Sequence, residues 1–397
     1  MADDPNPLYS RISGEVAMRA NRLWSVALEL HGDPETAFEE HRAARLLTGE
    51  LAAANFHVNR GVAGMPTAFT ARAGGGQGRC VALLLEYDAL PGLGHACGHN
   101  LIAAAGLGAA LALKAALGEG LGTVLAVGTP AEESGGGKVL EADAGLFEGA
   151  DAALMFHPGT RDWFYAPLTA HAQLRIGFHG RAANPTGNPT EGVDALAALI
   201  QLFNTLAVLE RRLPSGSHAQ GIVTEGGRAT NIVPEYAEGL FGLRGATTAA
   251  REELAALLEQ ASRGVAAATG TTVHIERVGV DYDHFRSNDV LAQRFAHHIG
   301  RCGIAMREPE PGIYLGSSDI GNVSTRVPAI HPFVAITEPD ACDHTPEFAA
   351  AAATPRARDV MLAAATGLAC TAADILRTDG VAEQAWNFHR AQAAADT

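Results

Sequence analysis

Apolar positions recur at helical spacing near the start of the chain, between about residues 12 and 56, and the pattern is interrupted once, at residues 31–34. This pattern predicts two amphipathic helices. Three short runs that are apolar on both faces follow, separated by helical stretches, at residues 80–85, 123–127 and 152–156. Such runs are typical of buried strands. The first part of the chain therefore predicts a mostly parallel β-sheet sandwiched by helices.

The pattern changes near residue 171, where strand-like and helical segments alternate. The strand-like segments lie at residues 171–179, 221–224, 236–244 and 271–278, and the helical ones at 191–212 and 249–268. This strand-helix-strand-strand-helix-strand series predicts a smaller α/β sandwich.

The first pattern resumes near Asn288 with a helix, a strand at residues 329–336 and a closing helix from Thr345. The smaller sandwich is therefore expected to be an insertion into the first domain, and the fold class is α/β. The expected domains are residues 1–170 with 283–397, and the inserted residues 171–282.

Polar residues follow each of the three apolar runs at its carboxyl end: residues 88–99 after the first, Glu132 and Glu133 after the second, and His157 after the third. Open α/β sheets bind their ligands at the carboxyl ends of their strands. These residues are therefore expected to form one site.

Composition narrows the classes of function. The chain has 397 residues with 29 Lys and Arg against 44 Asp and Glu, a net charge of −15, which disfavours nucleic acid and anionic membranes as partners. The five cysteines are odd in number and widely spaced, and the N-terminus lacks a signal-peptide pattern, so we expect a cytoplasmic protein without a disulfide framework. The apolar run at residues 101–117 contains Lys114 and suits a buried helix better than a membrane span.

Cys97 and His99 lie two residues apart in a glycine-rich turn, and thiolate and imidazole are zinc-ligand types. The alternative is a buried thiol beside a helix-capping imidazole. Glu132 and Glu133 point in different directions on extended backbone, so one could bind a metal while the other accepts a proton. The alternative for that pair is a solvated acidic turn.

His157 and His344 follow a strand-like run and precede a helix, respectively, and each alone would be a structural histidine. Asp343 or Thr345 could cap the helix that begins there. Together with Cys97 and His99, however, they could help to hold two metal ions that share a hydroxide and polarise a carbonyl.

The chain resembles the co-catalytic metallo-amidohydrolases, which include aminoacylases, carboxypeptidase-G-like enzymes and indoleacetyl-amino-acid hydrolases. It is most similar to the branch of p-aminobenzoyl-glutamate hydrolase and β-alanyl-dipeptidase-like enzymes, which has a cysteine metal ligand. The matching stretches are Glu86-Tyr-Asp-Ala-Leu-Pro91, Gly94-His-Ala-Cys-Gly-His-Asn100, Pro130-Ala-Glu-Glu133, His157-Pro158, Gly226-Gly227, Asn231-Ile-Val-Pro234, Gly316-Ser-Ser-Asp-Ile-Gly-Asn-Val-Ser324 and His344-Thr-Pro-Glu-Phe348.

This resemblance implies a hydrolase with two divalent metal ions per chain, zinc or manganese, with cobalt as a further option. It implies that Glu132 is the general base that deprotonates a metal-activated water, and that Asp88 supports a ligand or binds weakly. The implied inserted domain is a lid and the dimerisation surface of a homodimer. The implied metal ligands are Cys97, His99, Glu133, His157 and His344.

The resemblance also implies a small-molecule substrate that carries a carboxylate. Asn231 and Arg244 would hold this substrate in the site of the partner subunit, although Arg244 could instead be a surface charge on a strand. Ser317 and His218 are further substrate-binding candidates.

Two positions depart from the family pattern: Glu86 stands where many relatives begin the first motif with histidine, and Asn184 stands where relatives carry a lid histidine that reaches the scissile carbonyl. An amide can donate a neutral hydrogen bond to an oxyanion but supplies no positive charge. The expected reaction is hydrolysis of amide bonds in N-acyl amino acids or dipeptide-like molecules. Two alternatives remain: hydrolysis of a ureide, carbamoyl or amidine linkage, and a metal-binding homologue with weak catalysis or none.

Overall fold

The computed structural model of the protein describes residues 6–75, 78–118, 122–214 and 216–396. The chain forms two compact units. The first unit comprises the residues up to Pro167, Phe285–Ile313 and Asp319–Ala395, and the inserted unit comprises Leu168–His284 and Tyr314–Ser318 with Asp396. Tyr314–Ser318 belongs by sequence position to the first domain, but it packs with the inserted unit because the Thr169 amide donates a hydrogen bond to the Gly316 carbonyl at 2.8 Å.

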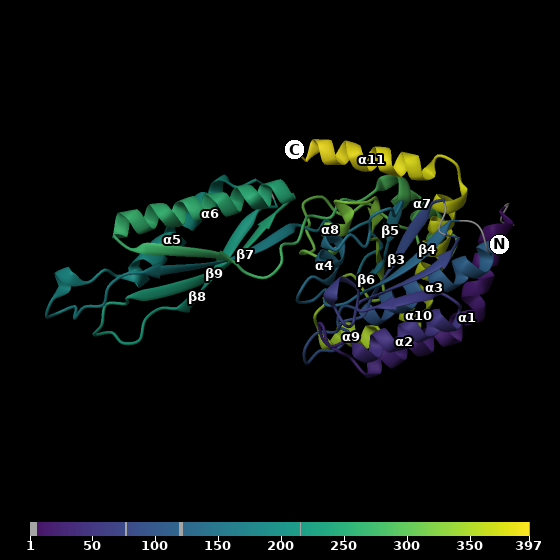
Figure 1. Ribbon diagram of the computed structural model, residues 1–397, viewed down its shortest axis with the longest axis horizontal. Helices are drawn as coiled ribbons and strands as arrows, with labels where there is room; N and C mark the ends of the chain where they lie inside the picture. The colour runs from purple at the N-terminus through teal and green to yellow at the C-terminus, as the bar shows by residue number, and fades with distance from the viewer. Residues whose placement is uncertain (1–5, 76–77, 119–121, 215, 397) are drawn as a thin grey trace. The chain divides into compact units, whose positions relative to one another are not determined.

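The first unit contains most of the helices in the described chain (Figure 1). Its helices are α1 (Pro7–Gly32), α2 (His41–Ala53), α3 (His99–Leu117), α4 (Gly137–Asp143), α7 (Asp289–Gly300), α8 (Ile320–Ser324), α9 (Pro346–Ala351), α10 (Pro355–Arg377) and α11 (Val381–Ala395). Its strands are β1 (His57–Arg60), β2 (Phe69–Gly74), β3 (Cys80–Glu86), β4 (Thr123–Thr129), β5 (Ala152–Leu154), β6 (His157–Gly159), β11 (Ala329–Ile330) and β12 (Phe333–Ala335).

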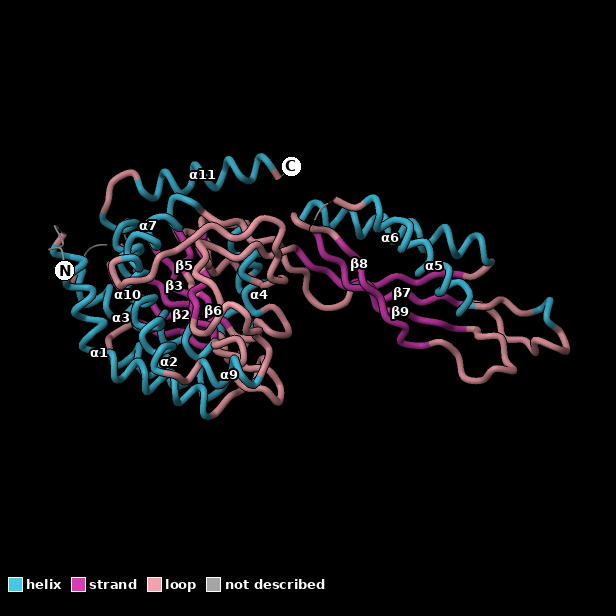
Figure 2. The backbone as a smooth tube through the Cα atoms, turned by 180° about the vertical axis from the view of Figure 1, so that it is seen from behind, coloured by secondary structure: helices cyan, strands magenta, loops and turns pink. Residues whose placement is uncertain are grey.

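Six of these strands form one mixed, mostly parallel sheet in the order β1-β2-β4-β3-β5-β11. Strands β4, β3, β5 and β11 run parallel, whereas β1 and β2 pair antiparallel at one edge. Every residue of β3 and β4 is buried, so helices and loops cover both faces of the sheet, as Figure 2 shows. The α/β class and the mostly parallel sheet expected from the sequence are thus confirmed.

The long apolar helices α3 and α10 pack against each other and against β3. Both are long and apolar enough to cross a membrane by length and composition alone, but most of their residues are buried inside the first unit. Their composition is therefore explained by their position in the core.

Prolines divide two segments that the sequence pattern joined. The strand expected at residues 329–336 is two short strands, β11 paired with β5 and β12 paired with β6, separated by His331 and Pro332. The closing helix is three helices: α9 begins at Pro346, α10 begins at Pro355, and α11 follows Gly380. Proline favours the first helical turn, and Thr345 caps α9 by accepting a hydrogen bond from the Phe348 amide.

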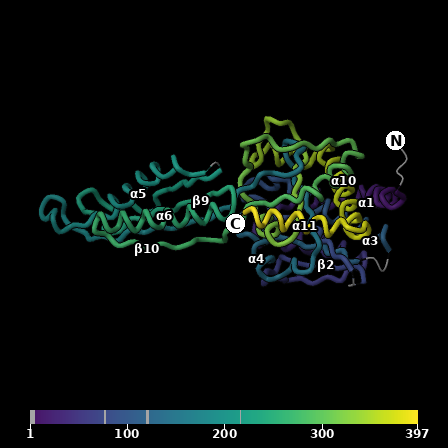
Figure 3. The backbone as a smooth tube through the Cα atoms, turned by 90° about the horizontal axis from the view of Figure 1, so that it is seen from above, coloured from purple at the N-terminus to yellow at the C-terminus, as the bar shows by residue number. Residues whose placement is uncertain are grey.

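The inserted unit is a four-stranded antiparallel sheet in the order β10-β7-β9-β8. Its strands are β7 (Ala170–His179), β8 (His218–Glu225), β9 (Tyr236–Gly245) and β10 (Thr272–Arg277), and its helices are α5 (Ala195–Leu209) and α6 (Thr248–Thr269). The two helices lie side by side along the unit (Figure 3). Alternate strand residues such as Leu174, Phe241 and Leu243 are buried in the core that these helices complete.

Candidate active site

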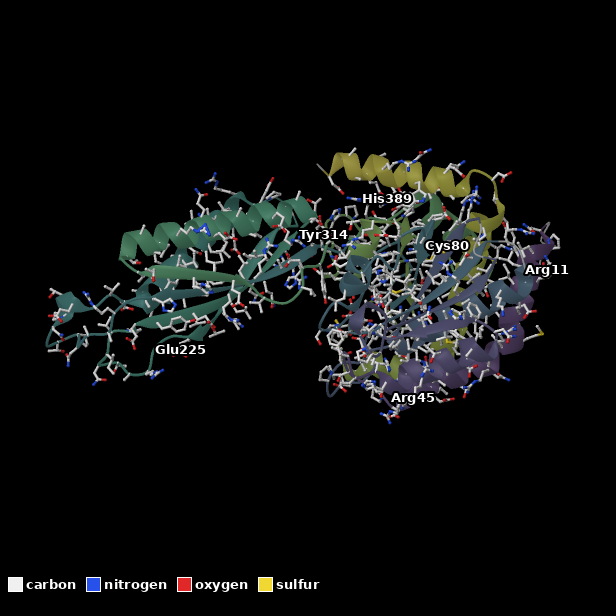
Figure 4. All side chains as sticks on the ribbon, viewed as in Figure 1. Arg11, Arg45, Cys80, Glu225, Tyr314 and His389 are labelled. Carbon is white, nitrogen blue, oxygen red and sulfur yellow. The ribbon has the colours of Figure 1, made fainter. Side chains whose placement is uncertain are left out.

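The carboxyl ends of β3 and β4 and the start of β6 lead into one group of polar side chains in the first unit. Cys80, the first residue of β3, marks the opposite end of that strand (Figure 4). The turn after β3 requires glycine at position 98, where φ is +74° and an added Cβ would lie 2.9 Å from the Pro158 ring. This turn places Cys97 and His99 on either side of Gly98, with His99 as the first residue of α3.

His99 is oriented by Asp88. Its Nδ1 lies 2.8 Å from the Asp88 carbonyl oxygen and 3.2 Å from the Asp88 carboxylate, and the second Asp88 oxygen accepts a hydrogen bond from the Glu133 amide at 2.9 Å. A histidine held this way presents Nε2 as a metal ligand. Asp88 thus contacts two of the candidate ligands, His99 and Glu133.

The Nε2 atom of His99 faces two carboxylates, with Glu86 Oε1 at 3.0 Å and Glu133 Oε1 at 3.9 Å. Burial alone would lower the pKa of His99, but the charges of Glu86 and Asp88 outweigh burial, so that the pKa of His99 lies well above the ordinary value. A cation is therefore favoured at this point, either the imidazolium or a bound metal ion.

Three groups of side chains offer ligand atoms that all lie within 4.8 Å of one another. They are Glu86 with His99 and His157, Cys97 with His99 and Glu133, and Cys97 with Asp343 and His344. The structure thus brings together all five ligands suggested by the sequence, and it adds Glu86 and Asp343, which sequence reasoning did not include.

Different contacts hold His157 and His344 beside the other candidate ligands. The His157 ring stacks on Phe333 at 4.6 Å between centroids, and its Nδ1 lies 2.6 Å from the Pro158 carbonyl oxygen. His344 is exposed with φ at +55°, its amide donates to the Ala96 carbonyl, and its Nε2 lies 3.7 Å from Glu133 Oε2.

The residues present fit a divalent metal. Glu86 Oε1 and His99 Nε2 are buried, and neither atom makes a hydrogen bond with any residue that the structure describes. Burial raises the pKa of the Cys97 thiol, and a metal ion would displace its proton. A donor set of one sulfur with imidazoles and carboxylates suits zinc and also accepts manganese or cobalt.

Glu132 is half-buried beside this group. Burial raises its pKa well above the ordinary value, and the nearby charges of Glu86 and Asp319 raise it further. A carboxyl group whose pKa is shifted toward neutrality is suited to accept and return a proton.

A buried ion cluster supports the site from behind. The Lys138 ammonium bonds to the Glu86 carboxylate and lies 2.8 Å from Asp319 Oδ1, and its backbone amide donates to Asp319 Oδ2 at 2.9 Å. All three side chains are fully buried. In the sequence, Lys138 stands out only beside glycines that do not form a phosphate loop, and no spacing signal connects it to a residue 181 positions away.

His331 is a buried histidine beside His157 that the sequence did not single out. Its ring meets that of His157 edge-on at 5.4 Å, and burial lowers its pKa well below the ordinary value. It is therefore a neutral ring in the wall behind His157.

The remaining candidates lie in the inserted unit. Arg244 on β9 is half-buried and donates to Ser317 Oγ at 2.5 Å, and burial lowers its pKa. It pairs across the sheet with His218 on β8 and His171 on β7, so these three side chains share one face of the sheet. This row can present positive charge and hydrogen-bond donors to a carboxylate.

Asn184 and Asn231 are both exposed in loops of the inserted unit. The Asn184 side-chain oxygen accepts hydrogen bonds from the Thr186 and Gly187 amides, both at 2.9 Å, in a local turn. Because the oxygen is used locally, the NH2 group is the part of this side chain that can donate to a ligand.

Comparison with known proteins identifies the family. The profile of peptidase family M20/M25/M40 matches residues 83–366. The Xaa-Arg dipeptidase of Mus musculus is 37% identical over 386 residues, covering 93% of this chain and 89% of the mouse protein. One of the subunits of the p-aminobenzoyl-glutamate hydrolase of Escherichia coli is 33% identical over 288 residues, covering 67% of this chain and 60% of that subunit.

The fold is also found in a solved structure. A dinuclear metal-binding peptidase of the M20 family from Bacillus subtilis superimposes with a TM-score of 0.67 at 19% identity, covering 88% of this chain and 98% of that one. With the profile match and the mouse relative, these findings show that the chain belongs to the M20/M25/M40 family of peptidases.

Proposed function

We propose that this enzyme hydrolyses the amide bond of dipeptides or N-acyl amino acids, with Glu132 as general base. The observation that carries the proposal is the convergence of metal-ligand side chains around His99, with a carboxyl group of raised pKa beside them. Family membership supports the reaction class.

Cys97, His99, Glu133, His157 and His344 would hold two divalent metal ions, zinc or manganese, with Glu86 and Asp343 close enough to contribute. Such a pair, when bound, supplies Lewis-acid polarisation of a carbonyl and lowers the pKa of water. Asp88 keeps the His99 ring in place, and Lys138 balances the charge of Glu86.

Glu132 would take a proton from the attacking water and pass it to the leaving amine. Asn184 would donate a hydrogen bond to the developing oxyanion. Arg244, assisted by Asn231, His218 and Ser317, would bind the carboxylate of the substrate, since a guanidinium matches carboxylate geometry.

The names of the relatives indicate which substrates to test first. Xaa-Arg dipeptides head the series because the mouse and human proteins with that name are 37% and 35% identical to this chain over about nine-tenths of its length. p-Aminobenzoyl-glutamate follows.

A second candidate is the same scaffold acting on a ureide, carbamoyl or amidine bond. The observation that favours it is Asn184, which offers only a neutral amide to the reacting carbonyl. A leaving group better than a peptide amine would need less stabilisation of the oxyanion.

The experiment is release of amine from a panel after loading the protein with zinc or with manganese. The panel contains Xaa-Arg dipeptides, β-alanyl dipeptides, N-acetyl amino acids, p-aminobenzoyl-glutamate and N-carbamoyl amino acids. Metal-dependent release from a peptide or acyl substrate supports the first proposal, and release from the carbamoyl compounds alone supports the second. Silence across the panel with metal bound would contradict both and indicate a non-catalytic homologue.

We also propose a homodimer that pairs through the inserted unit, in a reducing compartment such as the cytoplasm. Strand β8 is the edge of its sheet and exposes Ile222 at 57%, and α5 exposes Val208 at 64%. An unpaired edge strand with exposed apolar residues favours pairing with a second chain. All five cysteines are free, as a reducing compartment requires.

A further inference from the structure

We propose that Glu40 is a positioning residue for the loop at residues 131–136, which carries Glu132 and Glu133. This inference rests on the proposed function, because it assigns to Glu40 the task of keeping a general base and a metal ligand in place. In this proposal Glu40 acts on both through the Ala131 amide, which donates a hydrogen bond to its side chain.

The contacts of Glu40 carry the inference. Its side chain is fully buried, and Oε1 accepts hydrogen bonds from the Ala131 amide at 2.9 Å and from the Phe38 amide at 3.0 Å. Ala131 directly precedes Glu132, and its carbonyl accepts a hydrogen bond from the Gly136 amide at 2.9 Å, which closes the loop. One carboxylate oxygen of Glu40 therefore holds Ala131, the first residue of the loop.

Both amides belong to residues with unfavourable backbone conformations. Phe38 has φ at +65° and Ala131 has φ at +60°, and neither is glycine. Residues with a Cβ avoid this left-handed region, so the surrounding contacts must hold them there. A shared, buried acceptor is such a contact, and it is strongest when ionised.

The Phe38 ring supports the far side of the same loop. A Cβ added to Gly135, where φ is +136°, would lie 2.3 Å from this ring. The same segment also touches the turn that carries Asp88, because the Ala89 amide donates to the Glu35 carbonyl at 2.8 Å. Residues 35–40 thus connect the two loops that supply Asp88 and Glu133.

A simpler role for Glu40 would be capping of α2, where it occupies the N-cap position. Its side chain makes no capping hydrogen bond there. The amides of Arg42 and Ala43 instead bond to the Glu35 carboxylate, at 2.8 and 2.9 Å. Burying a carboxylate is costly, and helix capping does not account for it.

The test compares Glu40→Leu, Glu40→Gln and the double variant Glu40→Leu/Ala131→Gly with wild type. The matched control is Glu39→Gln, since the Glu39 side chain is 75% exposed. We would measure kcat and KM at saturating metal, and cobalt affinity from the visible absorption of the bound ion. The second readout needs no substrate, so it distinguishes failure of this inference from failure of the proposed function.

We expect Glu40→Leu to lower kcat by about 10- to 100-fold with KM within about threefold, because small displacements of reacting groups cost rate. Cobalt affinity should fall by about tenfold, as for other residues that support metal ligands. Glu40→Gln keeps a hydrogen-bond acceptor but removes the negative charge, so it should lower kcat by about three- to tenfold.

The double variant separates positioning from general stability. Glycine adopts positive φ without strain, so Ala131→Gly should recover about fivefold or more of the lost kcat and cobalt affinity. Wild-type kcat and cobalt affinity in Glu40→Gln and Glu40→Leu would overturn the inference. So would a loss that Ala131→Gly leaves unchanged, and if Glu40→Leu does not fold, Glu40→Gln decides alone.

Discussion

The Lys138 ammonium lies in the interior of the first unit, where it forms ion pairs with the carboxylates of Glu86 and Asp319. Burial alone would raise the pKa of Glu86, but the charges of Lys138 and His99 outweigh burial and lower this pKa to about 2. Burial raises the pKa of Asp319. One ammonium thus keeps Glu86 ionised beside His99. The cluster holds the Glu86 carboxylate so that its other oxygen, Oε1, faces His99.

Replacing Lys138 with methionine should destabilise the protein by about 3–5 kcal/mol, because it removes the ammonium that pairs with two buried carboxylates. Urea unfolding measures the change. Lys114→Met is the control, since Lys114 is only half-buried and bonds to a backbone carbonyl. A loss below about 1 kcal/mol for Lys138→Met would show that the cluster is not needed for stability.

Glu40 gives a pH dependence whose sign follows from its pKa. Burial first, and then the charge of Asp88, raise this pKa from 4.5 to about 7 against the backbone hydrogen bonds that lower it. Tyr87, a further titratable neighbour, has a pKa well above its usual value and stays neutral. Because the folded pKa lies above the unfolded one, the contribution of Glu40 to stability is complete below pH 4.5 and is lost as pH rises through about 7.

Glu40→Gln removes this loss. The difference in unfolding free energy, variant minus wild type, should therefore increase between pH 5 and pH 8 by roughly 3 kcal/mol at most. Denaturant unfolding at several pH values measures it, with Glu39→Gln as control. A difference that does not vary with pH would contradict a raised pKa for Glu40.

At the scale of single residues, the sequence indicated the candidate metal ligands more clearly than the residues that support them. Cys97, His99 and Glu133 are recognisable because thiol, imidazole and carboxylate groups in short turns have a limited set of uses. Lys138, Asp319 and Glu40 act through contacts between distant segments, and a lysine or glutamate in a loop carries no such chemical signal. Only the fold brings them together.

The turn between β3 and α3 depends on Gly98 for two separable reasons. Gly92 in the same loop has the same φ of +74°, but an added Cβ there meets nothing within 4 Å, whereas at Gly98 it meets Pro158 at 2.9 Å. The two glycines therefore distinguish backbone strain from steric contact.

Gly92→Ala should cost about 1–2 kcal/mol from backbone strain alone. Gly98→Ala should cost more and should also weaken zinc binding by about tenfold or more, because Cys97 and His99 flank it. Thermal unfolding and zinc titration measure both. Equal effects of the two substitutions on zinc affinity would show that the Pro158 contact does not position the ligands.

Element boundaries could be predicted where local chemistry sets them. Of the two cap candidates Asp343 and Thr345, Thr345 caps α9, and the helix expected near Asn288 is α7, which Asn288 caps. The pairing of β1 and β2 at the sheet edge was not predicted, since both are short strands with partly exposed faces. Which strand pairs with which depends on long-range contacts that periodicity does not report.

The whole molecule is a member of the M20/M25/M40 family with a mixed sheet that carries the site and a separate antiparallel sheet. Figure 4 shows Glu225, the last residue of the edge strand β8, at the margin of the inserted unit. The proposed homodimer would cover this strand.

Ile222→Lys combined with Val208→Glu should convert a dimer to a monomer, because each adds a charge to an exposed apolar site of the inserted unit. Sedimentation velocity at micromolar concentration measures the state. Met18→Lys, which changes an exposed residue of α1 in the first unit, is the control. A wild-type monomer, or a double variant that remains dimeric, would contradict pairing through this surface.

The central claim is that Glu132 is the base of a metal-dependent hydrolase. The most direct measurement is amine release by metal-loaded wild type and Glu132→Gln, with metal content determined on the same samples. Glu141→Gln is the matched control, because Glu141 is also a buried glutamate whose pKa burial raises, but it belongs to none of the three candidate metal-ligand groups. The account predicts metal-dependent release by wild type and Glu141→Gln, and about a 100-fold or greater loss in Glu132→Gln with its metal retained. Wild-type turnover in Glu132→Gln would contradict it.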